Sequence, residues 1–219
     1  HISGEVKADF LKKIEKQLKR LYREEQSSGI DLAIYQKRAL GIDIKKISSS
    51  IKANTIMTPV QKESLSHIFK YIVRLGISKI KLASPGGEIS QVYPLGFLIK
   101  EMGIKIVIPA NALCASACSF LFHFSKDRSL EVDAKLMYHL GVVYAGKNVF
   151  QISKCDPFNL NDCKLSKNRQ LVMKAYREFI ISLPEIIRVD VMNGKKRFVY
   201  RKEATILGLS TFIPFKDRR

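Results

Sequence analysis

Residues 81–87 read KLASPGG, a short apolar strand that runs into two successive glycines. Paired glycines let the backbone adopt positive φ angles and approach another group without a Cβ atom in the way. Further along, residues 114–118 read CASAC and place Ser116 before an apolar run. A serine at a strand-to-helix turn points its hydroxyl into a cleft while the following amides face an incoming oxyanion. These two stretches predict a site with a serine nucleophile.

A third stretch supplies a base for that serine. Residues 136–139 read LMYH, so a predicted strand ends in His139. Histidine is the commonest general base, and it activates serine nucleophiles. His123 lies two helical turns beyond Ser116, ~10 Å along the axis, so its imidazole is out of reach and we expect a packing or capping role. Ser116 and His139 together predict acyl-transfer chemistry.

Each of these motifs also has a structural interpretation. Ser116 fits a helix N-cap, the glycine pair fits a tight turn, and a lone histidine after an apolar run is usually structural. The order of the three motifs along one chain is what favours chemistry. We expect no cofactor and no metal in this site.

In this order the motifs resemble the Clp-type serine proteases of the crotonase superfamily. The likeness extends from about residue 51 to 214 and includes SPGG at 84–87, ASA at 115–117, MYH at 137–139 and a closing strand and helix at 197–209. The resemblance implies an α/β fold in which ββα units wind into a right-handed spiral, over residues 41–219. Residues 1–40 are then an N-terminal helical extension. The cysteines around Ser116 resemble an exported bacterial branch of the family.

The same resemblance implies a role for each motif. Ser116 is the nucleophile, His139 the base, and the amides of Gly87 and Ala117 form the oxyanion hole. The substrate is a peptide or a protein. Residues 88–90, read as strand-like, are expected to pair with that extended peptide.

The sequence departs from the family at the third member of the triad. The acid that orients the histidine normally precedes the Arg-Phe pair, and Lys196 occupies that position. Lysine has no acceptor for an imidazole N–H, so Asp190, Asn193 or a backbone carbonyl would have to replace the acid. Losing this acid costs about 10⁴ in turnover in trypsin-like triads. The sequence therefore predicts a slow serine–histidine hydrolase. The alternative is a catalytically inactive binding or scaffold protein, whereas acyl-CoA chemistry leaves the Ser116–His139 pair unexplained.

Four cysteines raise a separate question about cross-links. Cys155 and Cys163 flank a polar loop, and we favour a disulfide between them over a zinc site built from all four thiolates, because the spacings lack CxxC knuckles. Cys114 and Cys118 are either buried thiols or a bridge. A disulfide indicates an oxidising compartment, so we expect a periplasmic or otherwise exported protein whose signal or anchor lies outside this sequence.

Composition indicates a folded, strongly basic protein. Apolar residues make up 46% of the 219 residues, and the formal net charge is +18. The basic residues are scattered and no aromatic nucleic-acid motif accompanies them, so nucleic acid is not an expected partner. No apolar run reaches the ~18 residues that a membrane-spanning helix needs. The amphipathic helix at 6–25 is expected to pack on the core or on a sister subunit of a homo-oligomer, or to lie on a membrane surface.

Periodicity and turn signals predict the remaining elements. A strand, a helix and a strand at short intervals over residues 77–108 are typical of a βαβ unit and a parallel sheet. Strands are expected at 41–52, 77–83, 104–108 and 197–200. Helices are expected at 32–40, 60–75, from 91–93 to 103, 116–125, 165–182, 185–192 and 202–207.

Overall fold

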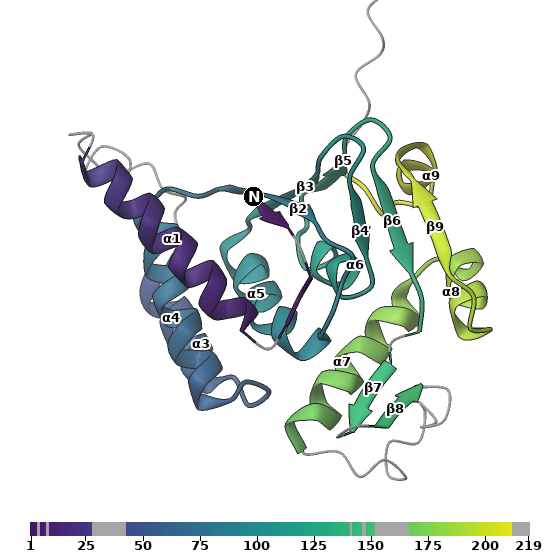
Figure 1. Ribbon diagram of the computed structural model, residues 1–219, viewed down its shortest axis with the longest axis horizontal. Helices are drawn as coiled ribbons and strands as arrows, with labels where there is room; N and C mark the ends of the chain where they lie inside the picture. Colours follow the sequence, from purple (N-terminus) through teal and green to yellow (C-terminus); the bar gives the residue numbers. More distant parts are fainter. Residues whose placement is uncertain are drawn as a thin grey trace, which may run out of the picture.

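The computed structural model describes residues 1–3, 5–7, 9–27, 43–140, 142–145, 148–151 and 167–211. Helices surround small sheets in a mixed α/β arrangement (Figure 1). The helices are α1 (Phe10–Ser27), α3 (Ile44–Ala53), α4 (Pro59–Arg74), α5 (Ile89–Met102), α6 (Ala117–Phe122), α7 (Lys167–Ser182), α8 (Glu185–Met192) and α9 (Arg201–Ile206). The strands are β1 (Ile2–Ser3), β2 (Lys79–Ala83), β3 (Lys105–Ile108), β4 (Leu113–Ala115), β5 (Arg128–Leu130), β6 (Lys135–Tyr138), β7 (Val142–Ala145), β8 (Asn148–Gln151) and β9 (Arg197–Tyr200).

The larger sheet is parallel. Its strand order is β1-β2-β3-β5, and every neighbouring pair runs in the same direction. The succession β2-α5-β3 explains this, because parallel neighbours need a crossover and α5 provides it. A smaller sheet has the order β4-β6-β9, with β6 parallel to β4 and antiparallel to β9. Strands β7 and β8 form an antiparallel pair. The predicted α/β class with a parallel sheet is confirmed.

Ser84 joins the two sheets. It follows β2 and forms an isolated parallel bridge with Cys114 of β4. Its amide donates to the Leu113 carbonyl at 2.9 Å, and its own carbonyl accepts from the Ala115 amide at 2.9 Å. The SPGG turn is therefore held directly beside the end of β4, where the serine turn begins.

The first residues of the chain belong to the same core. Strand β1 pairs with Leu82 and Ala83 of β2, and α1 packs against α4 (Figure 1). The helix predicted at 6–25 is confirmed as α1, although it begins at Phe10. Its buried side chains are Phe10, Leu11, Ile14 and Leu18. The boundary near residue 40 stays a prediction, and the helix predicted at 32–40 lies outside the described residues.

The strand predicted for residues 41–52 is wrong, because α3 occupies this segment. The Asp43 side chain accepts a hydrogen bond from the Lys46 amide at 2.9 Å and caps the helix. Ile47 and Ile51 lie one turn apart and are both buried. The isoleucine-rich segment thus has a helical rather than an alternating pattern, and its cap satisfies an amide that a helix start leaves unpaired.

Helix α5 begins at Ile89, two or more residues earlier than predicted, and so contains Pro94. Proline lacks the amide that would bond to the Ser90 carbonyl one turn before. The side chain of Gln61 replaces that donor, because its Nε2 lies 3.0 Å from the Ser90 oxygen. Gln61 also completes the capping box of α4 with Thr58. The other predicted elements between residues 60 and 207 are present with shifts of a few residues at their ends.

Candidate active site

Ser116 lies in the tight turn between β4 and α6. Its backbone has φ 55° and ψ −119°. A non-glycine residue rarely adopts such a conformation, which costs about 1–3 kcal/mol unless the surroundings impose it. The Ser116 amide donates to the Met137 carbonyl at 2.9 Å, and its carbonyl accepts from the Phe120 amide at 3.0 Å. The hydroxyl makes no capping hydrogen bond to α6, so the N-cap interpretation does not account for this serine.

The glycine pair is a close backbone approach, as predicted. Gly86 has φ 105°, and a Cβ atom there would lie 2.7 Å from both the Ala115 oxygen and the Ser116 Cβ. Gly87 has φ 141°, and a Cβ atom there would lie 2.0 Å from the Val6 oxygen. One glycine therefore permits contact with the serine turn and the other permits contact with the N-terminal segment.

Residues 88–90 do not form the predicted strand. The Glu88 amide donates to the Val6 carbonyl at 2.9 Å, and the Val6 amide donates to the Gly86 carbonyl at 2.7 Å. Ile89 already belongs to α5. The protein's own N-terminal segment thus occupies the Glu88 amide, which was among the groups expected to pair with a peptide.

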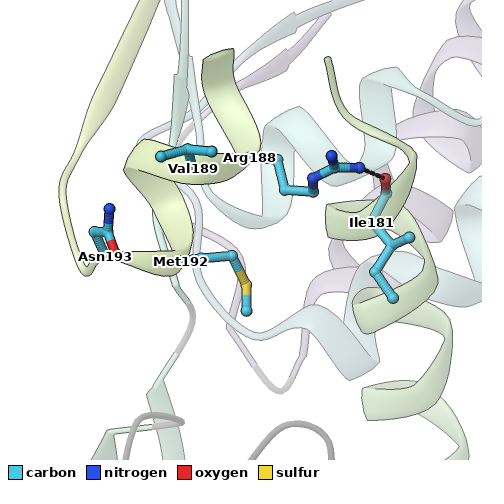
Figure 2. Close-up of a pocket in the computed structure, with 5 residues that line it drawn as sticks. All are labelled: Ile181, Arg188, Val189, Met192 and Asn193. Atoms are coloured by element: carbon cyan, nitrogen blue, oxygen red, sulfur yellow. Dashed lines mark hydrogen bonds between the residues drawn. The ribbon is translucent and has the colours of Figure 1, made fainter. Parts of the chain in front are cut away.

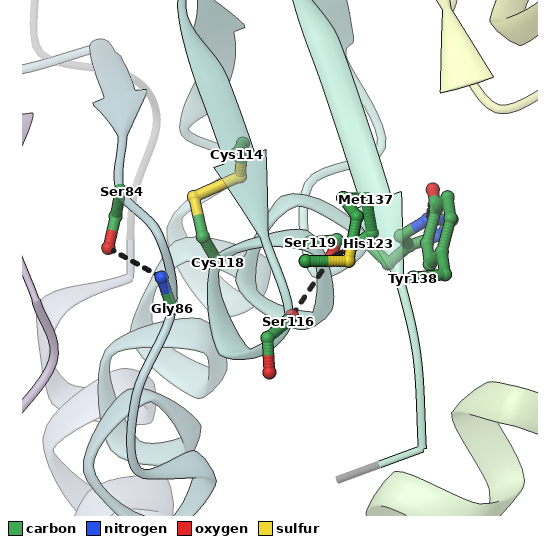
Figure 3. The surroundings of a disulfide bond; sticks show 9 residues. All are labelled: Ser84, Gly86, Cys114, Ser116, Cys118, Ser119, His123, Met137 and Tyr138. Atoms are coloured by element: carbon green, nitrogen blue, oxygen red, sulfur yellow. Dashed lines mark hydrogen bonds between the residues drawn. A yellow bond between two sulfur atoms is a disulfide. The ribbon is translucent and has the colours of Figure 1, made fainter. Parts of the chain in front are cut away.

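Ser119 connects the serine turn to strand β6. Its Oγ atom lies 2.9 Å from the Ser116 carbonyl oxygen and 2.7 Å from the Met137 carbonyl oxygen. Figure 3 shows this side chain between the two segments, with the Ser116 hydroxyl pointing away from it. Ser119 is 1% exposed, and the two carbonyls that it contacts also accept from the Phe120 and Ser116 amides. One buried hydroxyl therefore helps fix the turn against the strand that precedes His139.

Cys114 and Cys118 form a disulfide that spans the serine turn (Figure 3). Both residues are buried, one at the centre of β4 and the other in α6. The structure thereby selects a bridge over two buried thiols. Bonded sulfurs are no longer thiolate ligands, so the zinc alternative with all four cysteines does not describe this protein. Cys155 and Cys163 lie outside the described residues.

His139 follows β6 directly, as predicted. Ala115 and Met137 are paired in the parallel β4–β6 ladder, so Ser116 and His139 follow the carboxyl ends of neighbouring strands. In parallel sheets this edge is where sites form. The Nδ1 atom of His139 lies 2.6 Å from the Leu140 carbonyl oxygen. Because a carbonyl only accepts, this contact assigns the proton to Nδ1 and leaves the lone pair on Nε2.

Tyr176 of α7 contacts the main chain of His139. Its hydroxyl donates to the His139 carbonyl at 2.8 Å. Its ring meets Phe120 of α6 edge to face, with centroids 5.6 Å apart. Burial raises the pKa of the Tyr176 hydroxyl, so this group stays a neutral donor at physiological pH.

His123 is a packing residue, as expected. Its Nε2 atom lies 2.9 Å from the Tyr138 hydroxyl, and its ring packs edge to face on Phe179. Burial, with a smaller contribution from the positive charge of Arg128, lowers the pKa of His123 to about 3. The imidazole is therefore neutral at physiological pH. The contact with Tyr138 gives α6 and β6 a second link beside that of Ser119.

The candidates for the orienting acid lie around β9. The carboxylate of Asp190 lies 3.7 Å from the Lys195 ammonium and 3.9 Å from Arg197 Nε. Arg197 also pairs with Glu203. Asp190 is thus placed among cations, and no distance to His139 follows from these contacts. The backbone carbonyl that was the third alternative is present at Leu140, whereas Asp190 and Asn193 stay predictions.

Asn193 lies at a different feature, an open pocket of about 380 Å³ between α7 and α8. Figure 2 shows Ile181, Val189 and Met192 around it, with Arg188 Nη1 donating to the Ile181 carbonyl at 3.1 Å. Ser116 and His139 are not among the residues that line this pocket. The pocket therefore adds nothing to the serine site.

The basic residues of α1 lie on its exposed face. Lys12, Lys16, Lys19 and Arg23 follow one another at helical spacing and are all exposed. The opposite, apolar face is buried in the core. Within the described ranges, no helix combines the length and apolarity needed to cross a membrane. Any contact of α1 with a membrane surface would use the basic face.

Comparison with known proteins finds a distant structural likeness but no match in sequence. No protein-family model matches the chain, and no curated protein sequence matches it. Among solved structures, a mutant of the 1510-N membrane-bound stomatin-specific protease is similar with a TM-score of 0.43 and 12% sequence identity, over 74% of this chain and 76% of that one. A likeness at this level identifies neither a family nor an activity.

Ser119 and Tyr176 are not predictable as site residues from the motifs of the sequence. Tyr176 occurs in an apolar stripe of α7 whose members Val172, Phe179 and Ile180 are buried. A tyrosine hydroxyl within such a stripe indicates a buried hydrogen-bond acceptor, but the periodicity of the sequence does not identify that acceptor. Ser119 offered no signal beyond its place one turn after Ser116.

Proposed function

We propose that this protein is a serine hydrolase of the peptidase type, with a Clp-like fold in which ββα units form a spiral. Ser116 is the nucleophile and His139 the general base. The observation that carries the proposal is the backbone of Ser116, with φ 55° and ψ −119°. Buried serines in ordinary helix starts have no need of this conformation, whereas a nucleophile at a sharp strand-to-helix turn does.

The proposed reaction proceeds through an acyl-enzyme. His139 Nε2 accepts the Ser116 proton as the oxygen attacks a peptide or ester carbonyl, and it then donates that proton to the leaving group. In the second half of the cycle, water attacks the acyl carbonyl and gives its proton to His139 Nε2. The imidazole then returns that proton to Ser116 Oγ as the acyl group leaves. The contact of Nδ1 with the Leu140 carbonyl supports this role, because it leaves Nε2 able to accept. The amides of Gly87 and Ala117 are the proposed donors to the oxyanion.

A dyad supported by a carbonyl is expected to be slow. The Leu140 carbonyl orients the imidazole, but it carries no full charge to stabilise the imidazolium that forms during the reaction. The proposed catalyst therefore relies on this carbonyl, with Lys196 in the family's acid position, and Asp190 and Asn193 are the alternative orienting groups. This arrangement also supports the alternative function, an inactive binding or scaffold protein that retains the fold.

Covalent labelling separates these functions. A fluorophosphonate probe should modify the wild-type protein at Ser116, and Ser116→Ala should abolish the labelling. Ser90→Ala is the matched control, because Ser90 belongs to the first turn of α5 after the glycine pair and its hydroxyl contacts Glu88. Labelling of the wild type and of Ser90→Ala alone supports the hydrolase. A wild-type protein that stays unlabelled after long exposure supports the scaffold.

The proposed location is the periplasm or another oxidising compartment. The disulfide between Cys114 and Cys118 supports it, because such bonds persist where thiols are not kept reduced. The proposed substrate is a peptide or a protein, and assembly into a homo-oligomer and contact of α1 with a membrane surface are further proposals.

A further inference from the structure

We propose that Tyr176 is a positioning residue for His139 and takes over the orienting work that the family gives to an acid. The inference rests on the proposed function of Ser116 and His139. It starts from the hydrogen bond that the Tyr176 hydroxyl donates to the His139 carbonyl at 2.8 Å. This hydrogen bond acts on the main chain of His139 and does not involve the imidazole atoms directly.

The contact acts on the same short loop that fixes the imidazole. His139 Nδ1 lies 2.6 Å from the carbonyl of the next residue, Leu140, so ring and backbone form a closed loop. The orientation of the ring then depends on the orientation of the two peptide units on either side of Leu140. Tyr176 holds the first of these units through its carbonyl. If that unit turns, the Leu140 carbonyl moves relative to Nδ1.

Tyr176 also contacts the helix of the nucleophile. Its ring packs edge to face on Phe120 of α6 and lies 5.7 Å from the ring of Phe179. Phe120 donates its amide to the Ser116 carbonyl, so one side chain lies against the helix that follows the nucleophile and the main chain of the base. Tyr176 is 3% exposed, so its hydroxyl has little access to water as an alternative acceptor.

The spectrum of the imidazoles tests this role without relying on catalysis. In ¹⁵N-histidine spectra, assigned with His139→Gln, the wild type should show His139 with the proton on Nδ1. Tyr176→Phe keeps the ring but removes the hydroxyl, and it should give a mixture of the two tautomers. Tyr200→Phe is the control, because Tyr200 is half exposed on β9, and it should keep the wild-type signal. An unchanged His139 signal in Tyr176→Phe would overturn the proposal.

Labelling rates test the same role in the reaction. Tyr176→Phe should slow fluorophosphonate labelling about tenfold, the rate equivalent of one hydrogen bond. In a His139→Gln background the same change should have no effect, because nothing is left to position. Equal slowing in both backgrounds would assign Tyr176 a purely structural role and overturn the proposal. If the wild type is not labelled at all, the proposed function fails, and the imidazole spectra alone decide the role of Tyr176.

Discussion

A Cβ atom on Gly86 would lie 2.7 Å from the Cβ atom of Ser116. The SPGG turn and the serine turn are therefore in backbone contact, although about thirty residues separate them in the sequence. Residue 86 must be glycine for two reasons. Its φ of 105° disfavours residues with a side chain, and the serine turn fills the space where a Cβ atom would lie.

Gly86→Ala should destabilise the protein and displace the nucleophile. We expect the free energy of unfolding to fall by about 3 kcal/mol or more, from the strained φ together with the two close contacts. Gly103→Ala is the control, because Gly103 has φ 64° but open space around its Cβ position, and it should cost about 1 kcal/mol. Urea unfolding measures both. Equal losses in the two variants would show that the contact with Ser116 does not matter.

The hydroxyl of Ser119 should affect both stability and reactivity. Ser119→Ala removes one hydrogen bond to a carbonyl that keeps its backbone amide donor, which should lower the free energy of unfolding by about 0.5–1.5 kcal/mol and slow probe labelling of Ser116. Ser125→Ala is matched, since Ser125 is also 1% exposed and its hydroxyl contacts the carbonyls of Ile104 and Asp127. It should lose similar stability and label at the wild-type rate. If Ser125→Ala slows labelling as much as Ser119→Ala, the link to β6 is not specific.

The disulfide should stabilise the serine turn. Replacing Cys114 and Cys118 together by alanine should lower the free energy of unfolding by about 2 kcal/mol, as the chain-entropy model gives for so short a loop. Adding a reductant should reduce the stability of the wild type toward that of the variant and leave the variant unchanged. A variant as stable as the oxidised wild type would contradict this role.

The free energy of unfolding should decrease as the pH is lowered, because of His123. The unfolded imidazole takes up a proton near pH 6.5, whereas in the folded protein its pKa is about 3. Between these values the unfolded state binds more protons, so acid favours unfolding. This group alone should remove up to about 1.4 kcal/mol per pH unit as the pH falls below 6.5. Urea titrations at pH 7, 6, 5 and 4 should show a shallower decline for His123→Gln, and an identical decline in both proteins would contradict the assignment.

Local patterns predicted most of the fold. An apolar stripe and the helix-start signal Thr58-Pro59 predict α4, which the structure confirms. Gly103, with φ 64°, ends α5 as predicted. The two errors have different physical causes. The start of α5 was predicted too late because the donor that compensates for Pro94 is a Gln61 side chain from another helix. The isoleucine content of residues 41–52 favours a strand, whereas the helix that forms there is capped locally by Asp43 and buries Ile47 and Ile51 on one face.

The site was predicted less completely than the fold. The positions of Ser116 and His139 after the ends of β4 and β6, and the close approach at Gly86, follow from residues whose neighbours in sequence signal a turn or a strand end. The Leu140 carbonyl and the Tyr176 hydroxyl orient His139 through groups that carry no sequence motif. The engagement of Glu88 by Val6 depends on the position of the first strand, which no local pattern specifies.

The central claim is that the Ser116 hydroxyl and the His139 imidazole act together. The most direct measurement is the rate constant for fluorophosphonate labelling of Ser116 in the wild type and in His139→Gln, with the unfolding midpoints of both proteins as a check. We expect His139→Gln to label at least about 100-fold more slowly, as loss of a general base requires. Labelling of a folded His139→Gln protein at the wild-type rate would contradict the account.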